Sequence, residues 1–464
     1  MYINYIMSSR RRLVQINPTN QGNGVFSFRG GVNQLVFDIP MTPAILNGKS
    51  VRVNGIFDTL LTATTRPANN SAVDGVNAGV ATGTDVFIDP RVGVSAAIDF
   101  LTIQNLEGAT YEEIKSYNRL CSSIIPLQEG IQSYLSGGID IGYGALGKEQ
   151  QQGLRCDNAF EFSIPLQAGF LMGNPIDLQL VRGLRITINL ASDLFVCGNN
   201  YWNNQVSTGG TAGSGAYYQM RNVNMSYELE VPDAAAQSAM VENMVGAWEY
   251  NAYSSFYQVI QSTDTNAVLN INKSRTLGAI MNLIPSEFIN NYNYNSNWAV
   301  QPLEANAAGI LKNQLNLQEL TWSKGGLRIP LDFEITTEEE QEQGVATSQK
   351  NFEELNAVRD VWSMSSFMKD LRTELSLTRS EGGVVIPGKY RNSMLENDAK
   401  NAWNIGVSYD HITSNGLNFK QTPLGLRFQT RPTAGINLQP HSLFCFIRHK
   451  NTIMFNNGQV SIQN

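Results

Sequence analysis

Residues 223–231 read VNMSYELEV, and every second side chain in this run is apolar. Successive side chains of a β-strand point to opposite faces of a sheet, so this alternation predicts a strand with one buried and one solvated face. Residues 184–190 (LRITINL), 405–409 (IGVSY) and 424–428 (LGLRF) alternate in the same way. A shift of one residue would expose each apolar set, so the register of these strands is strongly specified. The pattern predicts an all-β protein.

The run 327–335 also carries its apolar side chains on one face and predicts a further strand. Helices are predicted in only three places. Residues 351–376 have amphipathic spacing, residues 111–135 hold a shorter helical candidate that is broken at Pro126, and residues 233–247 hold the third. The chain is therefore expected to be all-β with minor helices.

The two halves of the chain resemble each other in architecture. Each opens with an aromatic-rich strand region (25–39 and 248–260) and closes with an alternating strand (223–231 and 443–455). A length of 464 residues also suits two β domains, since such domains often reach about 200–250 residues. We therefore predict an N-terminal arm (1–22), a first domain (23–231), a linker helix (232–247) and a second domain (248–464).

Two long polar connections, residues 62–95 and 198–216, are rich in Gly, Ala, Thr and Asn. Loops longer than about 15 residues are uncommon in compact domains and are usually functional. Both connections fall in the predicted first domain. We expect this domain to be a scaffold that presents its loops at one end.

The charge composition favours a protein that associates with itself. Charged residues make up 16% of the chain, against roughly 25% in an ordinary soluble domain, and charge is depleted in the cores of interfaces. The net charge of −7 argues against a whole-surface nucleic-acid binder. The one basic cluster is Arg10, Arg11 and Arg12. It could touch nucleic acid or a membrane surface, but the simpler interpretation is a solvated arm before the first strand.

The four cysteines are far apart and form no CxxC pair, so we expect reduced core residues in an intracellular setting. The N-terminus has its apolar part before its basic part, which is the reverse of a signal peptide. No run of residues is long and apolar enough to predict a membrane span.

Three motifs could carry chemistry, and each lacks the context that it needs. Residues 142–147 match GxGxxG but no apolar helix face follows them. The acidic run 338–342 lacks the alternating oxygen ligands of a calcium loop. The histidines, His411, His441 and His449, have no nearby set of catalytic or zinc-binding partners. We therefore predict no enzyme activity, no catalytic residue, no cofactor and no metal site.

Aromatic side chains cluster in polar segments at residues 201–202 and 292–298. They could stack on sugars or bases. They could equally be protein contacts, because Tyr and Trp are enriched at interfaces.

Several segments together resemble one protein family. The segment 160–170 (FEFSIPLQAGF), followed by 174–178 (NPIDL) and the strand 184–190, resembles the late strands of the first barrel in double jelly-roll major capsid proteins of icosahedral double-stranded DNA viruses. Residues 222–231 are similar to the last strand of that barrel, residues 37–40 and 51–57 to its first two strands, and residues 449–463 to the closing strands of the second barrel. The style is that of virophage and polinton-like virus proteins.

The resemblance implies two tandem eight-stranded jelly-roll barrels that stand side by side. It implies a homotrimer with a pseudo-hexagonal outline, made inside the host cell, which tiles the virion shell beside penton and minor or cement capsid proteins. The N-terminal arm would lie at the inner face, where Arg10–Arg12 would meet a membrane, the genome or a minor protein. The loops 62–95 and 198–216 would form outer towers. A carbohydrate-binding β-sandwich and a single jelly-roll penton or spike protein remain as alternatives.

Overall fold

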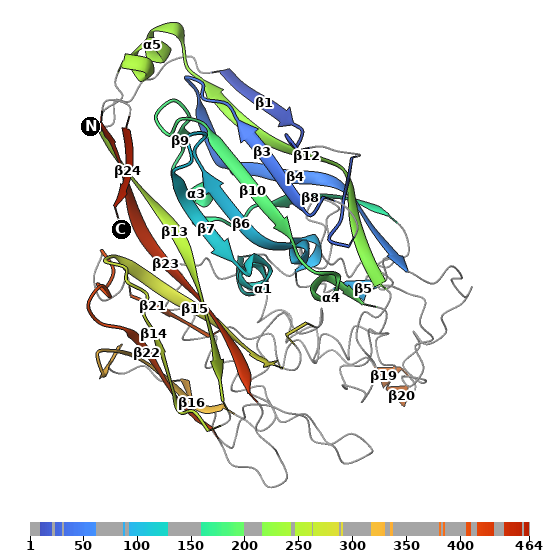
Figure 1. Cartoon of the computed structure of the whole chain (residues 1–464), viewed down its shortest axis with the longest axis vertical. Coiled ribbons are helices and arrows are strands. Elements are labelled where there is room, and N and C mark those ends of the chain that lie inside the picture. Colours follow the sequence, from blue (N-terminus) through green and yellow to red (C-terminus); the bar gives the residue numbers. More distant parts are fainter. Residues whose placement is uncertain are drawn as a thin grey trace.

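The computed structural model is built mainly from antiparallel strands, and its two halves occupy different parts of the molecule (Figure 1). It describes residues 10–20, 24–29, 32–61, 87–88, 92–128, 159–198, 216–242, 246–261, 263–286, 289–290, 317–329, 335–336, 380–381, 384–385, 405–409, 415–430, 440–456 and 459–463.

The first half forms two four-stranded sheets from eight main strands. These are β1 (Arg10–Ile16), β3 (Gln34–Ile39), β4 (Ile45–Leu61), β6 (Ile98–Gln104), β7 (Thr110–Lys115), β8 (Phe160–Pro165), β10 (Leu184–Leu190) and β12 (Ala216–Val231). One sheet has the order β1-β12-β4-β8 and the other β3-β10-β6-β7. Two short strands extend the first sheet: β2 (Val25–Phe26) pairs with β12, and β9 (Ile176–Asp177) pairs with β4. The strands β5 (Phe87–Ile88) and β11 (Cys197–Gly198) form a separate two-stranded sheet.

The second half repeats this arrangement. Its strands are β13 (Gly246–Ile260), β14 (Asn266–Leu269), β15 (Thr276–Pro285), β16 (Leu317–Lys324), β17 (Leu327–Arg328), β18 (Ile335–Thr336), β21 (Ile405–Ser408), β22 (Leu424–Thr430) and β23 (His441–Asn456). One sheet has the order β13-β23-β15-β21, and the other β14-β22-β16-β17, with β18 also on β16. The last strand, β24 (Gln459–Gln463), pairs with β23, and β19 (Ser380–Glu381) pairs with β20 (Val384–Val385).

The strand order is the same in both halves. If β17 and β18 count as one strand, one sheet follows the order first, eighth, third, sixth, and the other follows second, seventh, fourth, fifth. Two packed four-stranded sheets in this order form a jelly roll. The predicted fold of two tandem eight-stranded jelly rolls with minor helices is therefore confirmed.

The alternating sequence fixes the register of the core strands. In β10, every second side chain is buried, as predicted for residues 184–190. Ile186 lies between Phe37 of β3 and Ile103 of β6, and all three are fully buried. The first core also includes side chains from β13, β15 and β23, whereas the second barrel has a separate apolar cluster inside it. The first core therefore extends across the contact between the barrels.

The helices differ from the sequence expectation in two ways. Residues 111–115 of the helical candidate 111–135 belong to β7, and the helix α1 (Tyr117–Gln128) begins only after Ser116, which has a φ of 53°. The predicted break at Pro126 is wrong, because α1 continues to Gln128. Pro126 lies in the last turn, where a missing backbone N–H disturbs few later hydrogen bonds. The other short elements are η2 (Gly93–Ala97), α3 (Gly169–Met172) and α4 (Asp193–Val196).

Between the barrels, the helix α5 (Ala234–Glu242) lies within the predicted linker 232–247. Asp233 caps its start by accepting the Ala236 N–H at 2.9 Å. The predicted helix 351–376 lies outside the described residues. No helix in the described part of the chain is long and apolar enough to cross a membrane.

Two strand expectations need correction. Residues 10–16 of the predicted arm form β1, because Val14 and Ile16 pack on the first core; the arginines therefore lie within the first strand and not before it. In the run 327–335, Leu327 points to solvent and is 71% exposed, and described residues of the run belong to two short strands, β17 and β18.

Candidate functional site: the barrel junction and the sheet edges

The two barrels meet through an aromatic cluster. Tyr111 of β7 and Phe170 of α3 stack at 5.0 Å between ring centroids. Phe170 also makes edge contacts with Tyr250 at 5.1 Å and Trp248 at 5.4 Å, both on β13. Aromatic pairs of this kind contribute about 0.5–1.5 kcal/mol each beyond their buried area. The cluster joins the fifth strand of the first barrel to the first strand of the second.

Glu112 is a buried carboxylate at this junction. It accepts the backbone N–H groups of Gly169 at 3.1 Å, Phe170 at 2.8 Å and Tyr253 at 2.6 Å. Burial raises the pKa of Glu112 to about 7, against the opposing effect of these donors and of Arg448. Because Tyr253 belongs to β13, the Glu112 carboxylate accepts a backbone N–H at the outer edge of a strand in the other barrel.

A chain of polar side chains extends from this point into the second barrel. The Tyr250 hydroxyl donates to the Tyr111 carbonyl at 2.8 Å and accepts from Asn451 Nδ2 at 3.2 Å. Asn451 Oδ1 lies 2.9 Å from His449 Nδ1, and His449 Nε2 lies 2.8 Å from the Ser254 hydroxyl. Since Asn451 Oδ1 must accept, the neutral imidazole carries its proton on Nδ1, and Nε2 accepts from Ser254.

Ser254, His449 and Asn451 have the connectivity of a nucleophile, a base and an orienting amide. These side chains are poorly suited to proton transfer, because burial lowers the pKa of His449 to about 3 and makes it a poor proton acceptor. His449 is also only 1% exposed. We interpret the three side chains as a structural link between β13 and β23. The sequence missed this link because its members are about 200 residues apart.

Helix α1 anchors the first barrel on β15 of the second. Arg119 is buried, its guanidinium donates to the Ile289 carbonyl at 2.6 Å, and it lies 5.7 Å from the Phe444 ring. Asn282 of β15 donates to the Arg119 carbonyl at 2.9 Å and accepts from the Ser123 hydroxyl at 2.8 Å. These bonds satisfy polar groups that would otherwise be costly to bury. The junction is therefore packed and hydrogen-bonded across its width.

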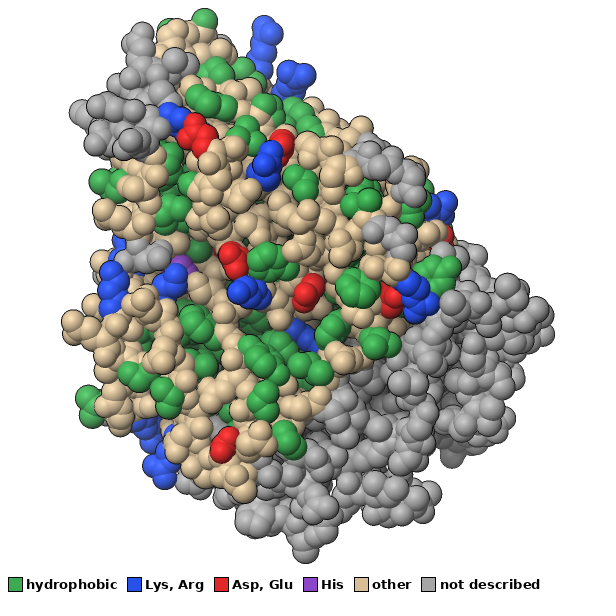
Figure 2. Space-filling view, in the orientation of Figure 1, with side chains coloured by type: hydrophobic (Ala, Val, Ile, Leu, Met, Phe, Trp, Pro, Cys, Tyr) green, Lys and Arg blue, Asp and Glu red, His purple; other side chains and the backbone are tan. Residues whose placement is uncertain are grey.

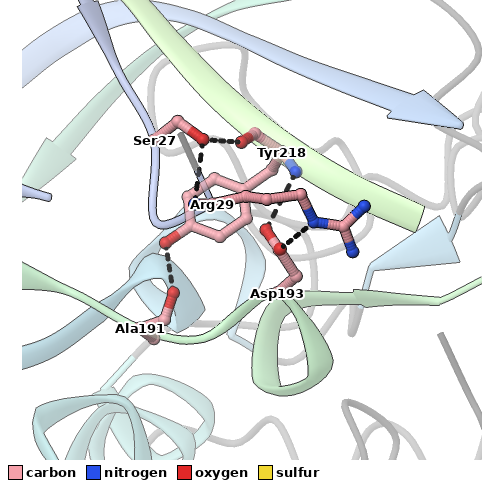
Figure 3. A network of polar contacts seen from close by, with 5 residues as sticks. All are labelled: Ser27, Arg29, Ala191, Asp193 and Tyr218. Atoms are coloured by element: carbon pink, nitrogen blue, oxygen red, sulfur yellow. Dashed lines mark hydrogen bonds and ion pairs between the residues drawn. The ribbon is translucent and has the colours of Figure 1, made fainter. Parts of the chain in front are cut away.

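A separate network of hydrogen bonds and one ion pair connects segments of the first barrel beside β12 (Figure 3). Asp193 of α4 accepts the Tyr218 N–H at 3.4 Å and pairs with Arg29 at 3.2 Å. The Tyr218 hydroxyl donates to the Ala191 carbonyl at 2.6 Å, and the Ser27 hydroxyl donates to the Tyr218 carbonyl at 3.3 Å. The network ties the segment after β2 to α4 and β12, next to the long connection that the sequence singled out at 198–216.

The basic cluster is divided between the two faces of β1. Arg10, Arg11 and Arg12 are all exposed. By strand alternation, Arg10 and Arg12 share the face of Val14 and Ile16, while Arg11 shares the outer face with Leu13. Arg11 lies opposite Glu230 on β12, whereas Arg10 and Arg12 lie opposite Val231 and Leu229. The sequence predicted one basic patch, but the strand separates its charges.

Charge is sparse on the face of the molecule drawn in Figure 2. Figure 2 shows lysine, arginine and acidic side chains standing singly or in small groups among neutral polar and apolar ones. This matches the charged fraction of 16% and suits surfaces that meet other proteins.

Several sequence candidates are buried or lie outside the described residues. His441 and His449 are buried in β23, and Cys121, Cys197 and Cys445 are buried free thiols. Within the described part of the chain, no group of three or more His, Cys, Asp or Glu side chains could hold a metal ion. The GxGxxG match, the acidic run, the aromatic segments, His411 and Cys156 lie outside it.

No family model and no curated protein sequence matches this chain. Solved structures do match its fold. A chain of the PBCV-1 virus capsid is similar with a TM-score of 0.55 at 13% identity, covering 100% of this chain and 98% of that chain. The Faustovirus major capsid protein gives 0.54 at 9% identity (98% and 92% covered), and a chain of the Sputnik virophage gives 0.52 at 8% identity (100% and 90% covered). The chain therefore has the double jelly-roll fold of these viral capsid proteins.

Proposed function

We propose that this chain is the major capsid protein of an icosahedral double-stranded DNA virus, and that it assembles as homotrimers of pseudo-hexagonal outline. One observation carries the proposal: the same eight-stranded jelly roll occurs twice, and the pair matches viral capsid chains over almost their whole length. Two jelly rolls in each of three copies make six similar barrels. Six barrels around a threefold axis give a nearly hexagonal tile.

The molecule's surface and interior support a shell role. The low charge lets faces of neighbouring copies meet without desolvating many ions. The buried polar junction holds the barrels in one relative orientation, which a repeating tile requires. In this proposal the protein is made inside the host cell, resides in the virion shell and contacts penton and minor capsid proteins.

The proposal places the N-terminal end of β1 at the inner face of the shell. There Arg10 and Arg12, which have no carboxylate directly opposite on β12, would be available to a membrane, the genome or a minor protein. Binding to phosphate groups would weaken with added salt, because each contact releases counterions.

The alternatives have less support. A penton or spike protein with a single jelly roll does not explain the second barrel. A carbohydrate-binding role rests on aromatic residues that lie outside the described part of the chain, and a glycan array tests it directly.

Native mass spectrometry of the purified full-length chain tests the proposal. We expect a stable homotrimer at micromolar concentration. A monomer under the same conditions would contradict the assembly that the proposal requires.

A further inference from the structure

The guanidinium of Arg29 is held in place from three directions. The Arg29 backbone N–H donates to the Ser27 hydroxyl at 3.3 Å, and Arg29 Nε donates to Asp193 Oδ2 at 3.2 Å. Arg29 Cζ lies 5.0 Å from the centroid of the Tyr217 ring, which is within the range of a cation–π contact. Asp193 is itself buried and accepts the Tyr218 N–H at 3.4 Å. The guanidinium is therefore oriented before any ligand binds.

The outer end of this guanidinium is open. Only Nε faces Asp193, and Figure 3 shows the two terminal nitrogens of Arg29 pointing away from the network. In the described part of the chain neither terminal nitrogen has a hydrogen-bond partner, and the Arg29 side chain is 42% exposed. A guanidinium presents its N–H groups as a rigid planar fork, which matches two oxygens of an oxyanion such as a carboxylate or a sulfate.

Two aromatic residues accompany the open fork. Phe28, which precedes Arg29, is 44% exposed although its side chain is large and apolar. Tyr217 is half-buried, and its hydroxyl makes no hydrogen bond within the described residues. An aromatic ring can pack on the C–H face of a sugar, and a tyrosine hydroxyl can donate or accept a hydrogen bond. An acidic side chain of a protein would use the fork alone, whereas an acidic sugar would use all three groups.

These residues lie at one end of the first barrel. Arg29 follows β2, whose Phe26 pairs with Met220 near the start of β12. Tyr217 is the second residue of β12, directly after the long connection 198–216. The exposure of Phe28 and Arg29 shows that a ligand can reach this end of the barrel from solvent.

We propose that Arg29, Tyr217 and Phe28 form a binding site for an acidic sugar, a saccharide that carries a carboxylate or a sulfate. The Arg29 fork binds two oxygens of the acidic group, the Tyr217 hydroxyl bonds to a sugar hydroxyl, and the Phe28 ring packs on the sugar. The site goes beyond the proposed shell function and does not depend on trimer formation. It is also separate from the aromatic segments 201–202 and 292–298, which lie outside the described residues.

Saturation-transfer NMR of the full-length protein with small soluble probes tests the site. The acidic probes are 3′-sialyllactose, which carries a carboxylate, and lactose 3′-sulfate; neutral lactose is the control. A short glutamate peptide represents an acidic protein partner. We expect signals from at least one acidic sugar, and none from lactose or the peptide at the same concentration.

Substitutions of Arg29 show whether the fork carries the binding. Arg29→Lys keeps the charge without the fork, and Arg29→Gln removes both. We expect each to weaken the binding of the acidic sugar by about tenfold or more, the effect of losing one charge-assisted hydrogen bond. Arg427→Lys is the matched control, since Arg427 is exposed on β22 outside this network, and it should bind as the wild type does.

Circular dichroism establishes that each variant is folded before its binding is compared. Absence of signal from both acidic sugars would overturn the site. Wild-type binding by a folded Arg29 variant, or equal binding of the glutamate peptide, would overturn it as well.

Discussion

Gly169 shows how closely the barrels approach each other at the scale of one residue. A Cβ atom built on Gly169 would lie 2.7 Å from the Asn251 carbonyl oxygen and 3.0 Å from the Ala252 Cα, both in the other barrel. Backbone atoms cannot move aside as a side chain can. We expect Gly169→Ala to lower the free energy of unfolding by about 1–3 kcal/mol, as overpacking usually does.

Gly246→Ala is the control for this substitution. Its Cβ would meet nothing within 4 Å, so chemical denaturation should give wild-type stability within about 0.5 kcal/mol. Equal stability of the two variants would contradict the close contact at Gly169.

Glu112 makes stability depend on pH. Its pKa is raised from 4.5 to about 7 by burial, so between these values the folded chain holds a proton that the unfolded chain has released. The resulting stabilisation is full below pH 4.5 and is lost as the pH rises through about 7. We expect wild-type stability, measured by urea denaturation, to fall by up to about 3 kcal/mol between acid and mildly alkaline pH from this group.

His449 acts in the opposite direction. Its pKa is lowered from 6.5 to about 3, so its contribution is full above pH 6.5 and is lost as the pH falls toward 3. Of these two groups, only Glu112 therefore changes the stability above pH 6.5. Glu112→Gln should remove the decline from about pH 6.5 to about pH 8; an unchanged decline in this variant would show that another group is responsible.

At the scale of elements, the sequence predicted strands well where one face is buried. The strand predicted at 184–190 coincides with β10, and that at 223–231 lies within the longer β12. The helical candidate 111–135 was partly wrong because its helix-like spacing spans two elements, β7 and α1, separated by the left-handed Ser116. The residues around Ser116 give no sequence signal for a left-handed backbone conformation at a serine.

β24 gives a test of strand alternation at the barrel junction. Val460 and Ile462 pack against the first core, while Ser461 and Gln463 are exposed. Replacing Val460 and Ile462 by alanine should cost about 2 kcal/mol of unfolding free energy, since these side chains are half-buried. Replacing Ser461 and Gln463 by alanine should cost little. Equal losses in the two double variants, measured by thermal denaturation, would contradict the packing of β24.

At the scale of the whole molecule, the apolar contact between the barrels predicts that they unfold together. Ile280, Phe446 and Phe455 of the second barrel belong to the core cluster of the first. Unfolding either barrel alone would expose apolar side chains of the other barrel to water. We expect one calorimetric transition for the full-length chain, and two well-separated transitions would show that this contact does not couple the barrels.

The sequence predicted two similar halves but could not predict how they meet. Architectural repetition is visible in the spacing of alternating strands along the chain. The bond from Tyr253 to Glu112 joins residues 141 positions apart, and neither residue stands out from its neighbours in the sequence. The exposure of Leu327 was also hidden, because this residue belongs to the apolar face of the strand predicted at 327–335.

The central claim is that this double jelly roll is a capsid tile. A cryo-electron microscopy map of the purified full-length protein tests it most directly. We predict three copies around one axis, with six barrels in a nearly hexagonal ring. A monomer, or an assembly without six barrels in a ring, would contradict it.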